Sequence, residues 1–86
     1  MSDLPRFNVM LLNDDKTPME FVVLVLERFF DMPNVEATTH MYRVHNEGVA
    51  ICGTYRREEA EKKVADVLAF AGAHKHSLKC VLEQAG

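Results

Sequence analysis

Three short apolar runs of strand type restrict how this 86-residue chain can fold. They span residues 7–12, 49–55 and 78–83, and longer segments with helical features separate them. Val, Ile, Phe and Tyr favour strands, and apolar and polar residues alternate in the last run, as in a half-buried strand. A sheet this small needs helices to bury its apolar side. We therefore expect an α+β domain with the order β-α-α-β-α-β.

The first helical segment has a well-marked start. Thr17 can cap the helix, Pro18 suits its first position, and Glu20 stands three residues after the cap. This pattern predicts a helix from Pro18 to about Asp31. Nearly all residues from 21 to 30 are apolar, so we expect this helix to be buried on most of its faces.

Two further helices are predicted, one from Pro33 to about Asn46 and one from Arg57 to about His74. Gly48 is a plausible stop for the earlier of the two. In the later one, two acidic residues stand four positions before two basic residues, namely Glu58, Glu59, Lys62 and Lys63. This spacing predicts ion pairs along the helix.

Composition favours one soluble domain and argues against several partners. Hydrophobic residues make up 48% and charged residues 27%, as in globular proteins. The net charge is −3, and the one dense basic cluster is interleaved with glutamates, so we expect no nucleic-acid binding. No apolar segment approaches the roughly 18 residues of a membrane span. We expect a short flexible tail over residues 1–6 and one domain over residues 7–86.

Cysteine usage and the N-terminus predict the compartment. Cys52 and Cys80 lie within apolar stretches, and a small secreted domain would carry more cysteines as disulfides. The first residues lack the charged start and apolar run of a signal peptide. We expect a cytoplasmic protein with reduced cysteines.

The most polar cluster, residues 13–17, lies between two apolar elements and allows two interpretations. Asn and Asp bond their own backbone in turns, so the cluster can simply connect a strand to a helix. It can also form a polar rim beside an apolar hollow. Such a rim suits a ligand with a cationic head and an apolar body.

A second cluster, Met41, Val44 and His45, has the spacing of one helical face. Core packing explains Met41 and Val44 equally well. If His45 converged with Asn13 and Asp15, the three side chains could surround one ammonium group. Sequence spacing leaves that convergence open.

Two other kinds of chemistry have weaker support. Four histidines could supply metal ligands, namely His40, His45, His74 and His76, but their spacing matches no metal-binding motif. Cys52 with His45 could act in nucleophilic catalysis, yet cysteines in strands usually belong to an inert core. We expect no cofactor, no metal site and no enzymatic activity.

Several segments together resemble the ClpS family. The main one is the run from Leu12 to Val23, which reads LNDDKTPMEFVV. The family order then continues through Val44–Gly48, Cys52–Gly53, Ala60–Ala65 and Leu78–Cys80. The similarity spans about residues 7–84. ClpS proteins are bacterial N-degron adaptors that deliver substrates to the ClpA unfoldase, an AAA+ ATPase, of the ClpAP protease.

The resemblance implies a fold and a role for individual residues. The family fold is an α/β sandwich of a three-stranded antiparallel sheet and three helices. The family binds the free α-amino group of a protein that starts with Phe, Tyr, Trp or Leu. The matching α-amino ligands are Asn13, Asp15 and His45. The matching side-chain pocket comprises Leu12, Thr17, Met19, Val22, Met41, Val44 and Leu78, with Met19 and Met41 near its mouth. Glu58 and Lys63 match positions that dock on the unfoldase.

The chain departs from the family pattern in three places. Lys16 stands where many members have an aromatic residue, and Ser77 stands where many have Pro. Both flank the ligand region and could shift the preferred first residue. Members also usually carry a longer N-terminal extension, which takes part in delivery.

Two alternatives remain at this point. One is a small enzyme that acts on peptide amino termini through His45 or Cys52. The other is a ribosome-associated module of similar small α/β shape, which would lack the Asn-Asp-Asp block.

Overall fold

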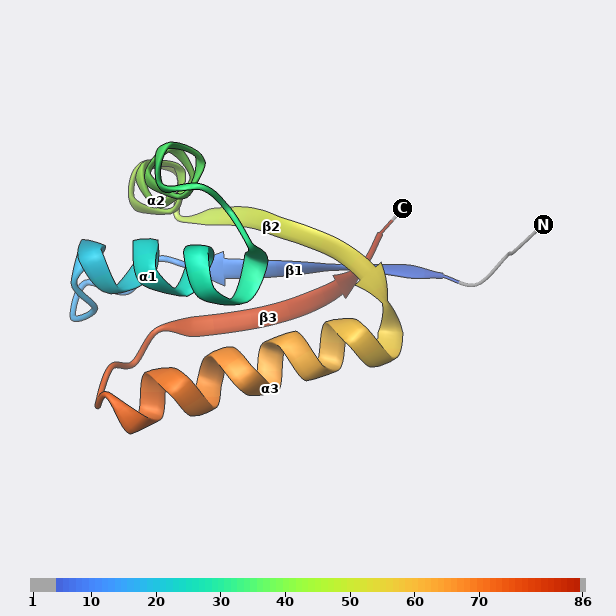
Figure 1. The fold of residues 1–86 in the computed structure, drawn as a ribbon. Coiled ribbons are helices and arrows are strands. Elements are labelled where there is room, and N and C mark those ends of the chain that lie inside the picture. The colour runs from blue at the N-terminus through green and yellow to red at the C-terminus, as the bar shows by residue number, and fades with distance from the viewer. Residues whose placement is uncertain (1–4, 86) are drawn as a thin grey trace.

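The chain forms its strands and helices in the predicted order (Figure 1). The computed structural model describes residues 5–85. The elements are β1 (Arg6–Leu12), α1 (Met19–Phe30), α2 (Asn34–Glu47), β2 (Val49–Arg56), α3 (Arg57–Ala73) and β3 (Lys79–Gln84). The predicted tail over residues 1–6 falls largely outside the described residues, but Arg6 already belongs to β1 and pairs with Arg56.

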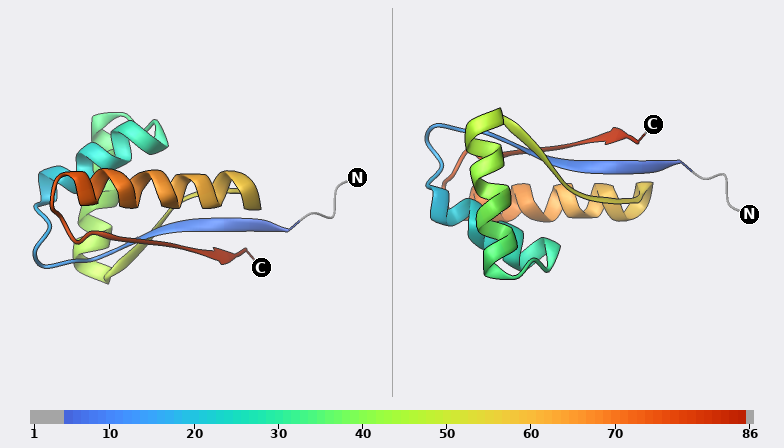
Figure 2. Two further views of the ribbon diagram at one scale, coloured as in Figure 1. Left: turned by 90° about the horizontal axis from the view of Figure 1, so that it is seen from below. Right: turned by 90° about the horizontal axis from the view of Figure 1, so that it is seen from above.

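The sheet has the order β2-β1-β3, and both pairings are antiparallel, as expected. The helices lie on one face of the sheet, and α2 runs across the direction of α3 (Figure 2). At one end of the sheet, Leu12 pairs with Val49 on one side and with Lys79 on the other. The end of β1 therefore meets the beginnings of both other strands, and the loops at this end come together.

The predicted cap at Thr17 is wrong. Pro18 occupies the N-cap of α1, and no side chain caps this helix. Thr17 lies one residue outside, where its hydroxyl donates to Asp14 Oδ2 at 2.6 Å. Pro33 likewise takes the N-cap of α2, one residue before the predicted helical position. The predicted stop of α2 is confirmed, because Gly48 is its C-cap with a φ of 88°.

The ion pairs predicted within α3 are also wrong for the residues described. Lys62 Nζ bonds Asp66 Oδ2 at 3.1 Å, one turn further along the helix. Lys63 turns inward and donates to the carbonyl oxygen of Phe29 at the end of α1. A helix C-terminus attracts a cation, so Lys63 joins α3 to α1.

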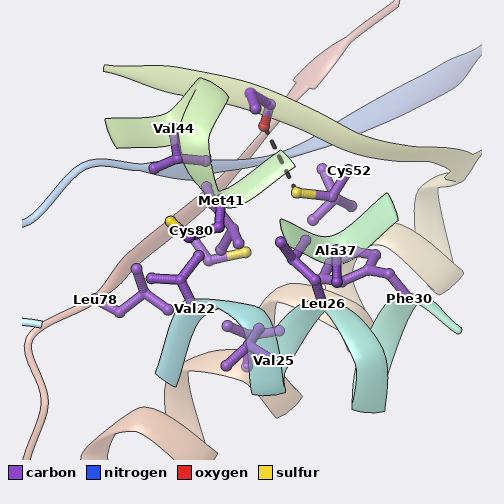
Figure 3. Packing of buried hydrophobic residues seen from close by; sticks show 14 of the residues in the cluster. Val22, Val25, Leu26, Phe30, Ala37, Met41, Val44, Cys52, Leu78 and Cys80 are labelled. Atoms are coloured by element: carbon purple, nitrogen blue, oxygen red, sulfur yellow. Dashed lines mark hydrogen bonds between the residues drawn. The ribbon is translucent and has the colours of Figure 1, made fainter. Parts of the chain in front are cut away.

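The core lies between the sheet and the helices (Figure 3). Val9 and Leu11 of β1 and Val25 and Leu26 of α1 are all fully buried and belong to one hydrophobic cluster. The first helix is less buried than predicted, because Leu24 is 40% exposed on its outer face. Its buried residues form one side of the helix and position its first turn beside the end of the sheet.

Strand β2 has an irregular pairing with β1. The register between β1 and β2 shifts at Cys52, next to Gly53. A Cβ added at Gly53 would overlap the Tyr55 ring, so glycine permits the close approach of this ring. Within residues 5–85, no helix has both the length and the apolar character needed to cross a bilayer.

Candidate functional site

A cavity of about 270 Å³ opens at the end of the sheet where the loops meet. Its lining comes from the end of β1 and the loop after it, the first turn of α1, the second half of α2 and the residue before β3. The residues are Leu12, Asn13, Asp14, Asp15, Thr17, Pro18, Met19, Val22, Met41, Val44, His45 and Leu78. Pockets for drug-sized ligands usually exceed roughly 300 Å³, so this cavity is of a size for a smaller group, such as one side chain.

The inner wall of the cavity is apolar and well packed. Val22 of α1, Val44 of α2 and Leu78 are each at most 7% exposed. Met41 is 6% exposed and belongs to this buried wall, whereas Met19 is 38% exposed and lies at the opening. Figure 3 shows Val22 and Leu78 close together, with Met41 reaching in from α2. Helical spacing brings Val22 to the same face as Met19, and Val44 to the same face as Met41.

The outer rim of the cavity is polar. Asn13, Asp15 and His45 are exposed, and all three line the cavity. The pairing of β1 with β2 brings them together, because Asn13 N donates to the carbonyl of Gly48 at 2.9 Å. Gly48 ends α2, and His45 lies in the last turn of that helix. The sheet register and the left-handed glycine together place the loop beside His45.

Asp14 is a cavity residue that the sequence interpretation missed. Its Oδ2 accepts hydrogen bonds from the hydroxyls of Thr17 and Ser77, both at 2.6 Å. These two bonds hold the pKa of the Asp14 carboxyl below its usual value, and the bond from Ser77 has the larger effect. Pro18 was also missed. Asp14 and Pro18 lie in the same run, residues 12–23, as most of the predicted cavity residues, so their position in the sequence could have indicated them.

The other singled-out residues lie outside the cavity lining. Lys16 is exposed in the turn, and Ser77 does not line the cavity but donates a hydrogen bond to Asp14, which does. Glu58 is exposed in the first turn of α3. Lys63 is partly buried, and its Nζ lies 5.7 Å from the ring centres of Phe30 and Tyr55.

The residues of the alternative interpretations have other surroundings. Cys52 is buried in the core and does not line the cavity, and burial raises the pKa of its thiol to about 12. The His76 ring lies 4.4 Å from that of Phe21, and His74 lies 4.5 Å from Phe70. Within the described part of the chain, no three His, Cys, Asp or Glu side chains gather as a metal site would require.

Comparison with known proteins gives this cavity a context. Residues 2–81 match the family model described as ATP-dependent Clp protease adaptor protein ClpS. The chain belongs to the ClpS family. It is 55% identical over 78 residues to the ATP-dependent Clp protease adapter protein ClpS of Hyphomonas neptunium, a match that covers 91% of this chain and 66% of the relative. The ClpS adapter of Xylella fastidiosa is 52% identical over 81 residues, which cover 94% of this chain and 76% of the relative.

A solved ClpS structure has the same fold. Agrobacterium tumefaciens ClpS2 bound to L-phenylalaninamide superimposes with a TM-score of 0.92 at 32% identity. The match covers 95% of this chain and 99% of that one. The fold predicted from the ClpS resemblance is therefore confirmed. The relatives are named as adapters of the Clp protease, and the chain spans about two thirds to three quarters of the length of the two relatives above.

Proposed function

We propose that this protein binds the free α-amino group and the bulky hydrophobic first residue of N-degron proteins and delivers them to a ClpA-type unfoldase. The observation that carries the proposal is the cavity itself, in which a polar rim of Asn13, Asp15 and His45 adjoins a buried apolar wall. The ClpS2 relative binds L-phenylalaninamide, which combines an α-amino group with an aromatic side chain.

The polar rim accounts for recognition of the amino group. An α-ammonium offers three N–H donors, and Asn13 and Asp15 each supply acceptor oxygens. His45 accepts a hydrogen bond at a ring nitrogen when it is neutral. Hydrogen bonds to a charged group contribute about 1.5–3 kcal/mol each. A blocked amine lacks the charge, so Asp15 would lose its ionic partner.

The apolar wall accounts for recognition of the side chain. Burial of a Phe or Leu side chain contributes about 1.5–3 kcal/mol. Because association itself costs several kcal/mol or more, we expect an affinity near micromolar, about −8 kcal/mol. Phe, Tyr, Trp and Leu are the first residues that we expect to bind. Met19, at the opening, would contact the part of the side chain nearest the backbone.

Asp15→Ala tests the role of the rim in peptide binding. We expect the dissociation constant of a Phe-initiated peptide to rise roughly tenfold or more, because the ammonium loses a charged acceptor. Glu20→Ala is the matched control, since Glu20 is an exposed carboxylate on the adjacent helix turn that does not line the cavity. If both variants weakened peptide binding equally, Asp15 would contribute only as part of the general negative charge of the surface, and its role in the rim would be excluded.

Delivery is tested by degradation of a Phe-initiated reporter by reconstituted ClpAP. We propose that Glu58 and Lys63 dock on the unfoldase, so Glu58→Ala should slow degradation while peptide binding stays unchanged. Glu59→Ala is the control, because Glu59 is the next exposed carboxylate in the same helix turn. A degradation rate that is the same for both variants would exclude the docking role of Glu58.

We also propose that the protein is not an enzyme. Cys52, one of the two residues considered for catalysis, is buried outside the cavity with a neutral thiol. The peptide should therefore keep its mass during prolonged incubation with the protein. A change in peptide mass would argue for catalysis instead.

A further inference from the structure

One carboxylate oxygen links two segments on different sides of the cavity. Asp14 Oδ2 accepts from Thr17 Oγ1 in the loop after β1 and from Ser77 Oγ in the connector between α3 and β3, both at 2.6 Å. The loop and the connector lie at the same end of the molecule in both views of Figure 2. The distance is typical of hydrogen bonds from a hydroxyl to a carboxylate, which are stronger than neutral ones.

The sheet does not hold these two segments together. The pairing of β1 with β3 ends at Leu12 and Lys79. Beyond it, the backbone N–H of Asn13 bonds to Gly48, on the side away from the connector. Among the described residues, the bond between Ser77 and Asp14 is the one hydrogen bond that joins residues 13–17 to residues 74–78.

The connector is itself fixed on the helices. His76 N donates to the carbonyl of Ala71 at 2.8 Å, and the His76 ring packs on Phe21. Leu78, which follows Ser77 directly, is 3% exposed and forms part of the cavity wall. Ser77 therefore presents its hydroxyl from a supported segment, and the loop is held against that segment.

We propose that Ser77, Asp14 and Thr17 form a clamp that fixes the width of the side-chain cavity and so sets which shapes of first residue fit. The proposal rests on the proposed function, because it concerns selectivity in the same cavity. Ser77 and Asp14 act as positioning residues, because they hold in place two residues of the cavity wall, Thr17 and Leu78. Proline, which many ClpS members have at the position of Ser77, has no hydroxyl and could not make this bond.

The test compares peptides that differ only in a first residue of Leu or Ile. These side chains are isomers, so the ratio of their dissociation constants reports shape rather than hydrophobicity. Wild-type protein should favour Leu. Ser77→Ala should reduce the ratio of Ile to Leu dissociation constants by about threefold or more, because a wall that can yield discriminates shape less. Ser77→Thr keeps a hydroxyl and should keep the wild-type ratio.

Thr54→Val is the matched control. Thr54 Oγ1 donates to Asn8 Oδ1 at 2.7 Å and joins two strands by an exposed side-chain bond away from the cavity. It should leave the ratio unchanged, even where it lowers stability. A wild-type ratio in Ser77→Ala, or the same loss in Ser77→Thr as in Ser77→Ala, would overturn the clamp.

Failure of the proposed function is separable from failure of the clamp. If the wild-type protein bound neither peptide, the proposed function would be wrong, and the clamp would be judged on the free protein. Thr17 N donates to the carbonyl of Asp14 at 3.0 Å, so Ser77→Ala should speed hydrogen exchange of this amide roughly tenfold. Exchange as slow as in Thr54→Val would then exclude the clamp.

Discussion

Gly48→Ala should destabilise the protein through backbone conformation alone. Gly48 has a φ of 88°, and a Cβ added there would meet no atom within 4 Å. The cost is therefore that of a left-handed conformation in a residue with a Cβ, about 1–2 kcal/mol. One kcal/mol shifts the melting temperature of a domain of this size by about 4–8 °C, so we expect a decrease of roughly 4–16 °C.

Gly72→Ala is the matched control, and we expect it to change the stability in the opposite direction. Gly72 lies in the last turn of α3, has no positive φ, and also leaves 4 Å of free space for a Cβ. Alanine is favoured over glycine in helices by up to about 1 kcal/mol, so Gly72→Ala should raise the melting temperature. Gly48→Asn should fall between wild type and Gly48→Ala, because asparagine tolerates the left-handed region better.

Thermal unfolding followed by circular dichroism measures all three variants. Peptide binding gives a second measurement, because the carbonyl of Gly48 accepts the hydrogen bond from Asn13 N that brings the loop to His45. Gly48→Ala should weaken binding more than Gly72→Ala does. A melting temperature that moves in the same direction for Gly48→Ala and Gly72→Ala would refute the conformational argument.

Three other outcomes are expected. Cys52 should react with a thiol reagent near neutral pH only after unfolding, because burial raises its pKa to about 12; prompt labelling of the native protein would contradict this. Lys63→Met should lower stability by up to about 1 kcal/mol, because the bond from Lys63 to the end of α1 is lost. Lys62→Met should lower stability by less, because Lys62 belongs to an exposed ion pair. Urea unfolding that showed the reverse order of the two variants would be contrary evidence. The pKa of Asp14 is lowered in the folded protein, so its contribution to stability is present above its unfolded pKa of 3.8 and is lost as pH falls through the folded pKa. Asp14→Asn should therefore cost stability near pH 7 but not in strong acid. A cost in stability that does not depend on pH would exclude this linkage.

The order of the elements was predictable because each depends on local chemistry. Apolar runs of strand length, the proline at each of the first two helix starts and the glycine after α2 all act within a few residues. The cap at Thr17 was mispredicted because the fixed φ of proline is compatible with both helical and extended backbone, and Pro18 is extended here, with φ −62° and ψ 145°, so the helix begins one residue later. The ion pairs failed for a similar reason, since Lys62 has an acidic residue four positions away on either side, Glu58 and Asp66.

The candidate site was only partly predictable from the residues. Helical spacing places Val44 and His45 near Met41, but it gives no information on the distance from His45 to Asn13. That proximity depends on the register of β1 against β2 and on the left-handed turn at Gly48. The bond between Asp14 and Ser77 joins residues that are 63 positions apart in the sequence, so no local pattern indicates it. The family resemblance supplied the set of residues before the structure placed them around one cavity.

Calorimetric titration of one Phe-initiated peptide, with its amino terminus either free or acetylated, tests the central claim most directly. The two forms carry the same side chain and differ only in the charged group that Asn13, Asp15 and His45 would hold. The free form should bind with a dissociation constant near micromolar, and acetylation should weaken binding by at least about tenfold, as expected for loss of one charged hydrogen bond. Equal affinity for the two forms would contradict the account.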